Sequence, residues 1–267
     1  MAQSEHMQGV VIRVRREGDV KLTLLTPEYG KVYVIAKGAK SLRGPQMPLS
    51  QLFAYGDFEL YHRGDFYWLN TGELIQSFRG LGADLDALNL ASYFCEVAAT
   101  VSDVDVPARE LVRLLLNTLH FLEKKSVSEA LLKGVFEWRV MAYQGIFPAL
   151  GGCADCGRQD ATDFSLDVAG GGLLCSSCRR RHETLSQLAG QRADATPMVL
   201  LTPAVLHAIR YTGTTPIEKM LSFRLEEAAD EQLFTRAGEQ FLRYHLDADY
   251  TSLQMYHRMK KQSVSLN

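Results

Sequence analysis

The sequence predicts a multidomain α+β protein with an N-terminal OB-type β-barrel, an α-helical domain and a four-cysteine zinc finger. Three observations support this prediction. Apolar residues alternate with polar ones over the first 80 residues, which is typical of half-buried strands. They then recur at three- and four-residue steps, which indicates amphipathic helices. Four of the five cysteines form two Cys-x-x-Cys pairs, a spacing typical of metal sites.

The chain has 267 residues, well above the roughly 150 expected for one domain, so several modules are expected. Its 46% hydrophobic and 22% charged residues are typical of an ordinary globular protein with a substantial core. We expect an OB-fold DNA-binding domain at residues 1–80, the first part of a helical domain at 81–150, the zinc finger at 151–182 and the second helical part at 183–267.

Five strands are predicted in the first module. Period-two alternation marks three of them, through Val10, Ile12 and Val14, through Val20, Leu22 and Leu24, and through Val32, Val34 and Ala36. Two more runs, 58–61 and 66–69, flank a turn at Arg63-Gly64. One long connection, 38–54, completes a pattern that fits a partly open OB-type barrel. An SH3-like barrel fits nearly as well.

Basic residues are concentrated in this module. Residues 13–43 contain eight Lys or Arg against three acids, whereas the whole chain has a net charge of −2. Such asymmetry is typical of a basic binding face on an otherwise acidic protein. The alternative is a solvated strand surface without a ligand.

The third strand gives the most specific candidate for nucleic-acid binding. Alternation places Lys31, Tyr33, Ile35 and Lys37 on one face, so that cations flank a ring, as in proteins that bind single strands. The alternative is that Tyr33 only covers the barrel edge and the lysines are solvated. Adding the first strand and the long loop, the predicted DNA contacts are Arg13, Arg15, Lys31, Tyr33, Lys37, Lys40 and Arg43.

Helical periodicity follows the barrel. It predicts helices around 85–95, 111–122 and 128–144, and two more after the cysteines, one starting at Thr202-Pro203 and one over 225–246. Trp138 and Met141 lie on the apolar stripe of the third helix and are assigned to its core. Cys95 lies in a mostly apolar run and is expected to pack as a small hydrophobe.

Cys153, Cys156, Cys175 and Cys178 have the spacing C-x2-C-x18-C-x2-C. Four thiolates satisfy tetrahedral Zn²⁺ and leave no position open for water or substrate, so one structural Zn²⁺ per chain is predicted. A redox pair is the minor alternative. The segment 151–172 has little periodicity and is expected to depend on something other than a large core.

Three arginines, Arg179, Arg180 and Arg181, follow the last cysteine. They are candidates for a secondary DNA contact beside the metal knuckle. A solubilising turn, or pairing with carboxylates of the acidic helices, is the somewhat stronger alternative.

Taken together, these features resemble the RecO family of recombination mediators. The resemblance covers about residues 9–180 and rests on Val11–Arg15, Leu22–Thr26, Tyr29–Lys31, Val34–Lys40, Phe136–Arg139, Gly145–Pro148, Cys153–Gly157 and Gly171–Cys178.

The resemblance implies a DNA-binding OB-fold and a helical domain with an inserted zinc finger. It also implies annealing of complementary strands, binding of single- and double-stranded DNA, and cooperation with RecR in helping RecA replace single-stranded DNA-binding protein. This chain departs from many relatives in its slightly acidic net charge.

The sequence offers little support for an enzyme. Gly30-Lys31 is followed by Val32, so no G-x-x-x-x-G-K-[ST] phosphate loop is present, and neither H-E-x-x-H nor a deaminase H-x-E motif occurs. A zinc-ribbon transcription or translation factor remains an alternative. The polar start and the lack of a long apolar run predict a cytoplasmic, nucleoid-associated protein without a membrane segment.

Overall fold

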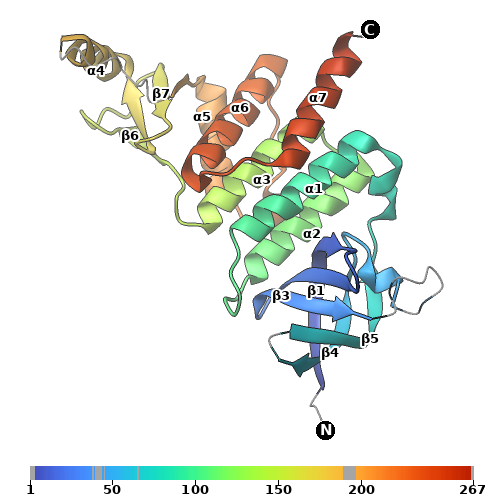
Figure 1. Cartoon of the computed structure of the whole chain (residues 1–267). Helices are drawn as coiled ribbons and strands as arrows, with labels where there is room; N and C mark the ends of the chain where they lie inside the picture. The colour runs from blue at the N-terminus through green and yellow to red at the C-terminus, as the bar shows by residue number, and fades with distance from the viewer. Residues whose placement is uncertain are drawn as a thin grey trace. The chain divides into compact units, whose positions relative to one another are not determined.

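The computed structural model describes residues 4–37, 39, 44, 46–64, 66–188 and 197–265 (Figure 1). The chain divides into two compact units. One unit combines Met1–Glu129 with Tyr250–Asn267, and the other is Ala130–Asp249. The C-terminal segment therefore returns to the unit that contains the N-terminus.

Five strands of the first unit form a closed barrel in the order β1-β2-β3-β5-β4. Neighbours are antiparallel except β3 and β5, which are parallel and pair only through Val34 with Tyr67 and Ile35 with Trp68. The prediction of five strands is confirmed, and the β3–β5 contact is its shortest seam. The strands are β1 (Ser4–Arg15), β2 (Val20–Thr26), β3 (Gly30–Ala36), β4 (Tyr55–Arg63) and β5 (Phe66–Gln76).

The alternation predicted for the first strand is wrong in one detail. The β1–β2 register shifts between Val11 and Arg13, so Val11 and not Ile12 belongs to the barrel core, with Val14 packed against it. Val10 and Ile12 are also buried, on a strand that α1 and α2 contact. A β-bulge inserts one residue and changes the face on which the following side chains lie, which simple period-two counting misses.

Three helices complete the first unit, α1 (Leu85–Thr100), α2 (Arg109–Lys124) and α7 (Thr251–Ser265). The Asp84 carboxylate caps α1 by accepting hydrogen bonds from the backbone N–H groups of Asp86 and Ala87. Helix α1 packs against both α2 and α7 (Figure 1). Its Cys95 is buried, which raises the pKa of that thiol and confirms a packing role.

The β2–β3 hairpin is docked on the loop that joins α1 to α2. Lys31 N donates to Asp103 O at 3.0 Å, and Asp105 N donates to Tyr29 O at 2.9 Å. Gly30 has φ +59°, and a Cβ there would collide with the carbonyl oxygens of Asp103 and Val106. Only glycine fits this position without a collision. The close approach and the two hydrogen bonds hold the hairpin, and with it this face of the barrel, in a fixed place relative to the loop after α1.

The second unit contains a four-stranded sheet in the order β6-β8-β7-β9. Much of it lies in residues 151–172, where the sequence shows little periodicity. After β8 the chain forms a helix, α4, which contains the three arginines for which a solubilising turn was one of the alternatives. The Thr202 hydroxyl caps α5, accepting from Val205 N at 3.2 Å, as the sequence predicts. The elements are α3 (Glu129–Tyr143), β6 (Ala149–Cys153), β7 (Phe164–Asp167), β8 (Gly172–Cys175), α4 (Ser176–Leu188), β9 (Met198–Leu200), α5 (Pro203–Thr214) and α6 (Ala228–Leu246).

Short 3-10 helices lie outside these elements, at Pro48–Ser50, Arg79–Ala83 and Ile217–Lys219. Within the described ranges, no helix is long and apolar enough to cross a membrane.

An aromatic cluster forms the core of the second unit. Trp138 is fully buried, and its ring contacts those of Phe147, Phe234 and Phe241. Met141 is buried as well, so the assignment of both residues to packing is confirmed. Beside this cluster, Lys133 of α3 is buried and pairs with Glu137 of α3 and Glu239 of α6. This cluster of charges links the two helices.

Candidate functional site

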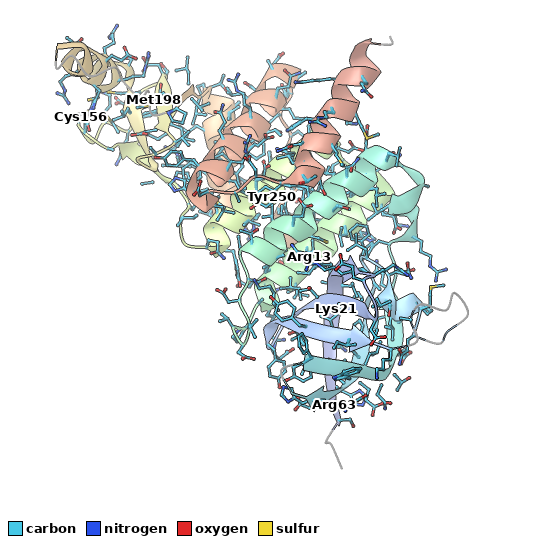
Figure 2. The ribbon with its side chains drawn as sticks, viewed as in Figure 1. Arg13, Lys21, Arg63, Cys156, Met198 and Tyr250 are labelled. Atoms are coloured by element: carbon cyan, nitrogen blue, oxygen red, sulfur yellow. The ribbon has the colours of Figure 1, made fainter. Side chains whose placement is uncertain are left out.

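The four paired cysteines meet at one point. Their sulfur atoms all lie within 4.8 Å of one another, and Cys156 Sγ is 3.8 Å from Cys175 Sγ. Four thiolates bonded to one Zn²⁺ at about 2.3 Å in a tetrahedron would be separated by roughly 3.8 Å. The donor set and its spacing therefore fit a single metal ion. Figure 2 labels Cys156 in this part of the second unit, the finger (β6, β7, β8 and α4, residues 149–188).

Local backbone geometry brings each pair of thiols together. Cys153 ends β6, and the chain turns back through Gly157, whose φ is +72°. This turn is closed by Gly157 N donating to Cys153 O at 2.9 Å and Cys153 N donating to Arg158 O at 2.8 Å. Cys175 ends β8, and Cys178 lies in the first turn of α4. Such tight turns are what a Cys-x-x-Cys pair needs in order to direct two thiolates at one ion.

The polypeptide favours a thiolate at Cys153. Burial alone raises its pKa, but the backbone N–H groups of Cys156, Cys175 and Asp155 outweigh burial and lower the pKa to about 6. Burial, followed by hydrogen bonds with the other cysteines, instead raises the pKa of Cys178 to about 12. A bound cation would relieve this opposition, because it would stabilise all four thiolates together.

A charged network surrounds the cysteines. Asp155 lies within the first pair, between Cys153 and Cys156, and accepts from His182 Nε2 at 2.6 Å and from Arg181 at 3.2 Å. The hydrogen bond from His182 is the main reason that the pKa of Asp155 is lowered. Arg181 also lies 3.6 Å from Cys178 Sγ. Cationic groups next to thiolate ligands orient them and balance their charge.

Two of the three arginines after the last cysteine already have carboxylate partners. Arg181 is bound to Asp155, and Arg179 pairs with Glu183 at 3.0 Å within α4. Their carboxylate partners lie in the finger itself and not in the neighbouring helices. Arg180 is exposed and has neither of these carboxylates as a partner.

The second candidate site is the outer face of the barrel. The register aligns Arg13 with Thr23 and Thr23 with Tyr33, and it aligns Arg15 with Lys21. A hollow of about 320 Å³ opens on this face. Its lining comprises Arg13, Arg15, Lys21, Leu22, Thr23, Tyr33, Val34, Ile35 and Phe66. Figure 2 labels Arg13 and Lys21 on this part of the barrel.

The predicted DNA-contacting residues have different environments. Arg13, Arg15 and Lys37 are exposed, and Tyr33 retains 45% exposure. Lys31 is only half-exposed, because its Nζ donates to Ala99 O at 2.9 Å, at the C-terminal end of α1. A cation there interacts favourably with the helix dipole, so Lys31 also has a structural partner. Lys40 and Arg43 lie outside the described residues.

Four residues of this face were not among the predicted contacts: Lys21, Arg63, Phe66 and Trp68. Lys37 Nζ lies 4.6 Å from the centre of the Trp68 ring, and Arg63 Cζ lies 5.7 Å from it. Lys21 could have been found from sequence, because it alternates with Leu22 on a predicted strand. The aromatic residues follow a turn and carry no comparable signal, since their position depends on the pairing of β3 with β5.

Two family models match the chain. The model described as "Recombination protein O N terminal" matches residues 1–78, and "Recombination protein O C terminal" matches residues 82–254. The relatives include the DNA repair protein RecO of Acetivibrio thermocellus, 25% identical over 247 residues, which are 92% of this chain and 93% of that protein.

Two further relatives carry the same description. The DNA repair protein RecO of Alkaliphilus metalliredigens is 31% identical over 173 residues, 64% of this chain and 70% of that protein. The DNA repair protein RecO of Bacillus subtilis is 30% identical over 173 residues, 64% of this chain and 67% of that protein.

Proposed function

The chain belongs to the RecO family, and on that premise we propose that it is a DNA repair and recombination mediator that binds single- and double-stranded DNA. The observation that carries the proposal is the barrel face, where Arg13, Arg15 and Lys21 surround exposed aromatic rings. Cations follow the phosphates of any sequence, and rings stack on any base. The combination suits a protein that binds DNA without reading its sequence.

The mediator acts by neutralising and aligning strands and not by catalysis. Two complementary strands repel each other through their phosphates, and a basic surface that binds both lowers this repulsion. RecR, single-stranded DNA-binding protein and, indirectly, RecA are the partners that the family resemblance implies. With RecR, the chain helps RecA replace single-stranded DNA-binding protein on the DNA, and it associates with the nucleoid.

Zn²⁺ is the ion proposed for the four cysteines, one per chain. It would supply a closed tetrahedral crosslink between β6, β8 and α4, with no position left for substrate. Because Arg181 and Arg179 are bound to carboxylates, the proposed secondary DNA contact of the finger rests mainly on Arg180.

The protein is expected to anneal complementary oligonucleotides without ATP, because alignment by charge requires no hydrolysis. The measurement is the rate of duplex formation between two labelled strands, with and without nucleotide, against the spontaneous rate. A strict requirement for hydrolysable nucleotide would contradict the proposed mechanism.

The triple variant Arg13→Ala, Arg15→Ala, Lys21→Ala is expected to weaken binding to single strands, more at low salt than at high salt. Each lost phosphate contact lowers the log-log salt slope by about 0.7, so the slope should fall by roughly 2. Fluorescence anisotropy across a salt series gives both quantities. The matched control is Lys124→Ala, Lys219→Ala, Lys261→Ala, which removes three exposed cations that lie outside the barrel face. Equal slopes for the two triple variants would place the DNA elsewhere.

A further inference from the structure

We propose that the hollow between Tyr33 and Phe66 receives one unpaired nucleobase of a single strand. We further propose that Trp68 positions Lys37 and Arg63 for the phosphates that flank this base. Both inferences rest on the proposed function and extend it, because they assign the base-binding subsite and add three residues to the predicted DNA-binding set: Arg63, Phe66 and Trp68.

The two rings come from strands that are distant in sequence. The parallel register pairs Val34 with Tyr67 and Ile35 with Trp68, so Phe66 lies next to Tyr33 across the same seam. Both residues line the hollow, and they are 45% and 43% exposed. Solvent-exposed aromatic rings on a barrel face forgo hydrophobic stabilisation unless a ligand covers them. A nucleobase is a flat ligand that such rings accept.

The lining of the hollow matches the parts of a nucleotide. The Ile35 side chain gives an apolar floor, whereas Arg13, Arg15 and Lys21 supply cations for a phosphate. A volume of about 320 Å³ is near the lower end for small-molecule sites, which span about 300–1,000 Å³. One base fits this space better than a base pair. A base must leave a duplex stack before its face can reach a ring, so the hollow favours single strands.

Trp68 has a different role from Tyr33 and Phe66. Lys37 and Arg63 both lie over its ring, and the Tyr61 ring is stacked beside it with centroids 6.5 Å apart. Its ring is therefore already occupied by protein groups. Lysine and arginine side chains are flexible, and the cation–π contacts with Trp68 restrain the Lys37 ammonium and the Arg63 guanidinium on this face. Trp68 is thus a positioning residue for charge.

The test compares binding of an oligothymidylate with binding of a strand of equal length in which every base is removed and every phosphate is kept. The protein is expected to bind the intact strand about 5- to 150-fold more tightly, which corresponds to stacking of one base. The double variant Tyr33→Ala, Phe66→Ala should bind both strands with the same affinity. The control Tyr29→Ala, which removes an exposed ring at the tip of the β2–β3 hairpin, should retain the preference.

Trp68→Leu should keep the preference for the intact strand but lower the salt slope by up to about 1.4, because two phosphate contacts lose their alignment. Trp68→Phe retains a ring under both cations and should restore the slope. A merely structural role of Trp68 would not change the slope selectively. Thermal melting of each variant shows that the barrel is folded.

The outcomes are distinct. Equal affinity of the unaltered protein for intact and abasic strands would overturn the base-binding subsite while leaving DNA binding intact. Retention of the preference in the folded double variant would place the base elsewhere and also overturn it. An unchanged slope in folded Trp68→Leu would overturn the role of Trp68. Failure of the unaltered protein to bind either strand would instead refute the proposed function.

Discussion

Cys175→Ser is expected to abolish zinc binding and to unfold the finger. Structural zinc sites contribute about 10–16 kcal/mol of binding free energy, which in a small module is also folding free energy. The finger has only short strands, and the contacts of Asp155 with Arg181 and His182, which also link the two cysteine pairs, involve exposed side chains and contribute little. Metal analysis should give one Zn²⁺ per unaltered chain and a ratio near zero for the variant.

Hydrogen exchange identifies which strands lose their structure in the variant. Amides of β6, β7 and β8 should lose protection in Cys175→Ser, whereas those of the barrel, which has its own core cluster, should keep it. Cys95→Ala is the matched control, because it removes the fifth cysteine, buried in α1, and should retain the metal. An unaltered protein with an ordered finger and no bound metal would contradict this interpretation of the cysteines.

Lys133→Met is expected to destabilise the second unit by about 3–5 kcal/mol, because it leaves buried carboxylates without their cation. Lys133 Nζ lies 2.7 Å from Glu137 Oε1 and 2.8 Å from Glu239 Oε2. The side chains of Lys133 and Glu137 are 1% and 0% exposed, so water cannot replace the lost partner at Glu137. Denaturant unfolding monitored by Trp138 fluorescence, in a Trp68→Phe background, gives the free energy of unfolding.

The double variant Lys133→Met, Glu137→Met serves as the control. It removes the buried charge together with its partner and should recover most of the lost stability, since Glu239 is 17% exposed and can be hydrated. A loss below about 1 kcal/mol in Lys133→Met would show that Glu137 is neutral or that water enters the cluster.

The sequence by itself predicted those features that depend on local order. Period-two alternation separated the buried Val32, Val34 and Ala36 from Lys31, Tyr33 and Ile35, which are not buried, because successive strand residues point to opposite faces. The four cysteines were identified by spacing alone, since each pair needs only one tight turn. Three- and four-residue steps predicted α1, α2 and α3, and the Thr202-Pro203 pair predicted the start of α5. These signals are also local, because each depends on a few neighbouring residues.

Local patterns failed where an extra residue or a short element intervened. The β-bulge after Val11 shifted the faces of β1, and the strands of the finger are too short to show a period. Helix α7 also belongs to the first unit, where Ser252 Oγ donates to Glu96 Oε1 at 2.8 Å. Periodicity shows that a helix exists and does not show which partner it packs against.

The sequence therefore determined which residue types face solvent on the barrel and which four thiols come together at one point. Only the tertiary structure decided which of these residues meet. The parallel pairing of β3 with β5 placed Phe66 beside Tyr33 and Trp68 beneath Lys37, and the docked hairpin gave Lys31 a partner at Ala99. The physical reason is that alternation and spacing are fixed by the geometry of a few consecutive residues. Pairing between distant strands instead depends on the closure of the whole barrel.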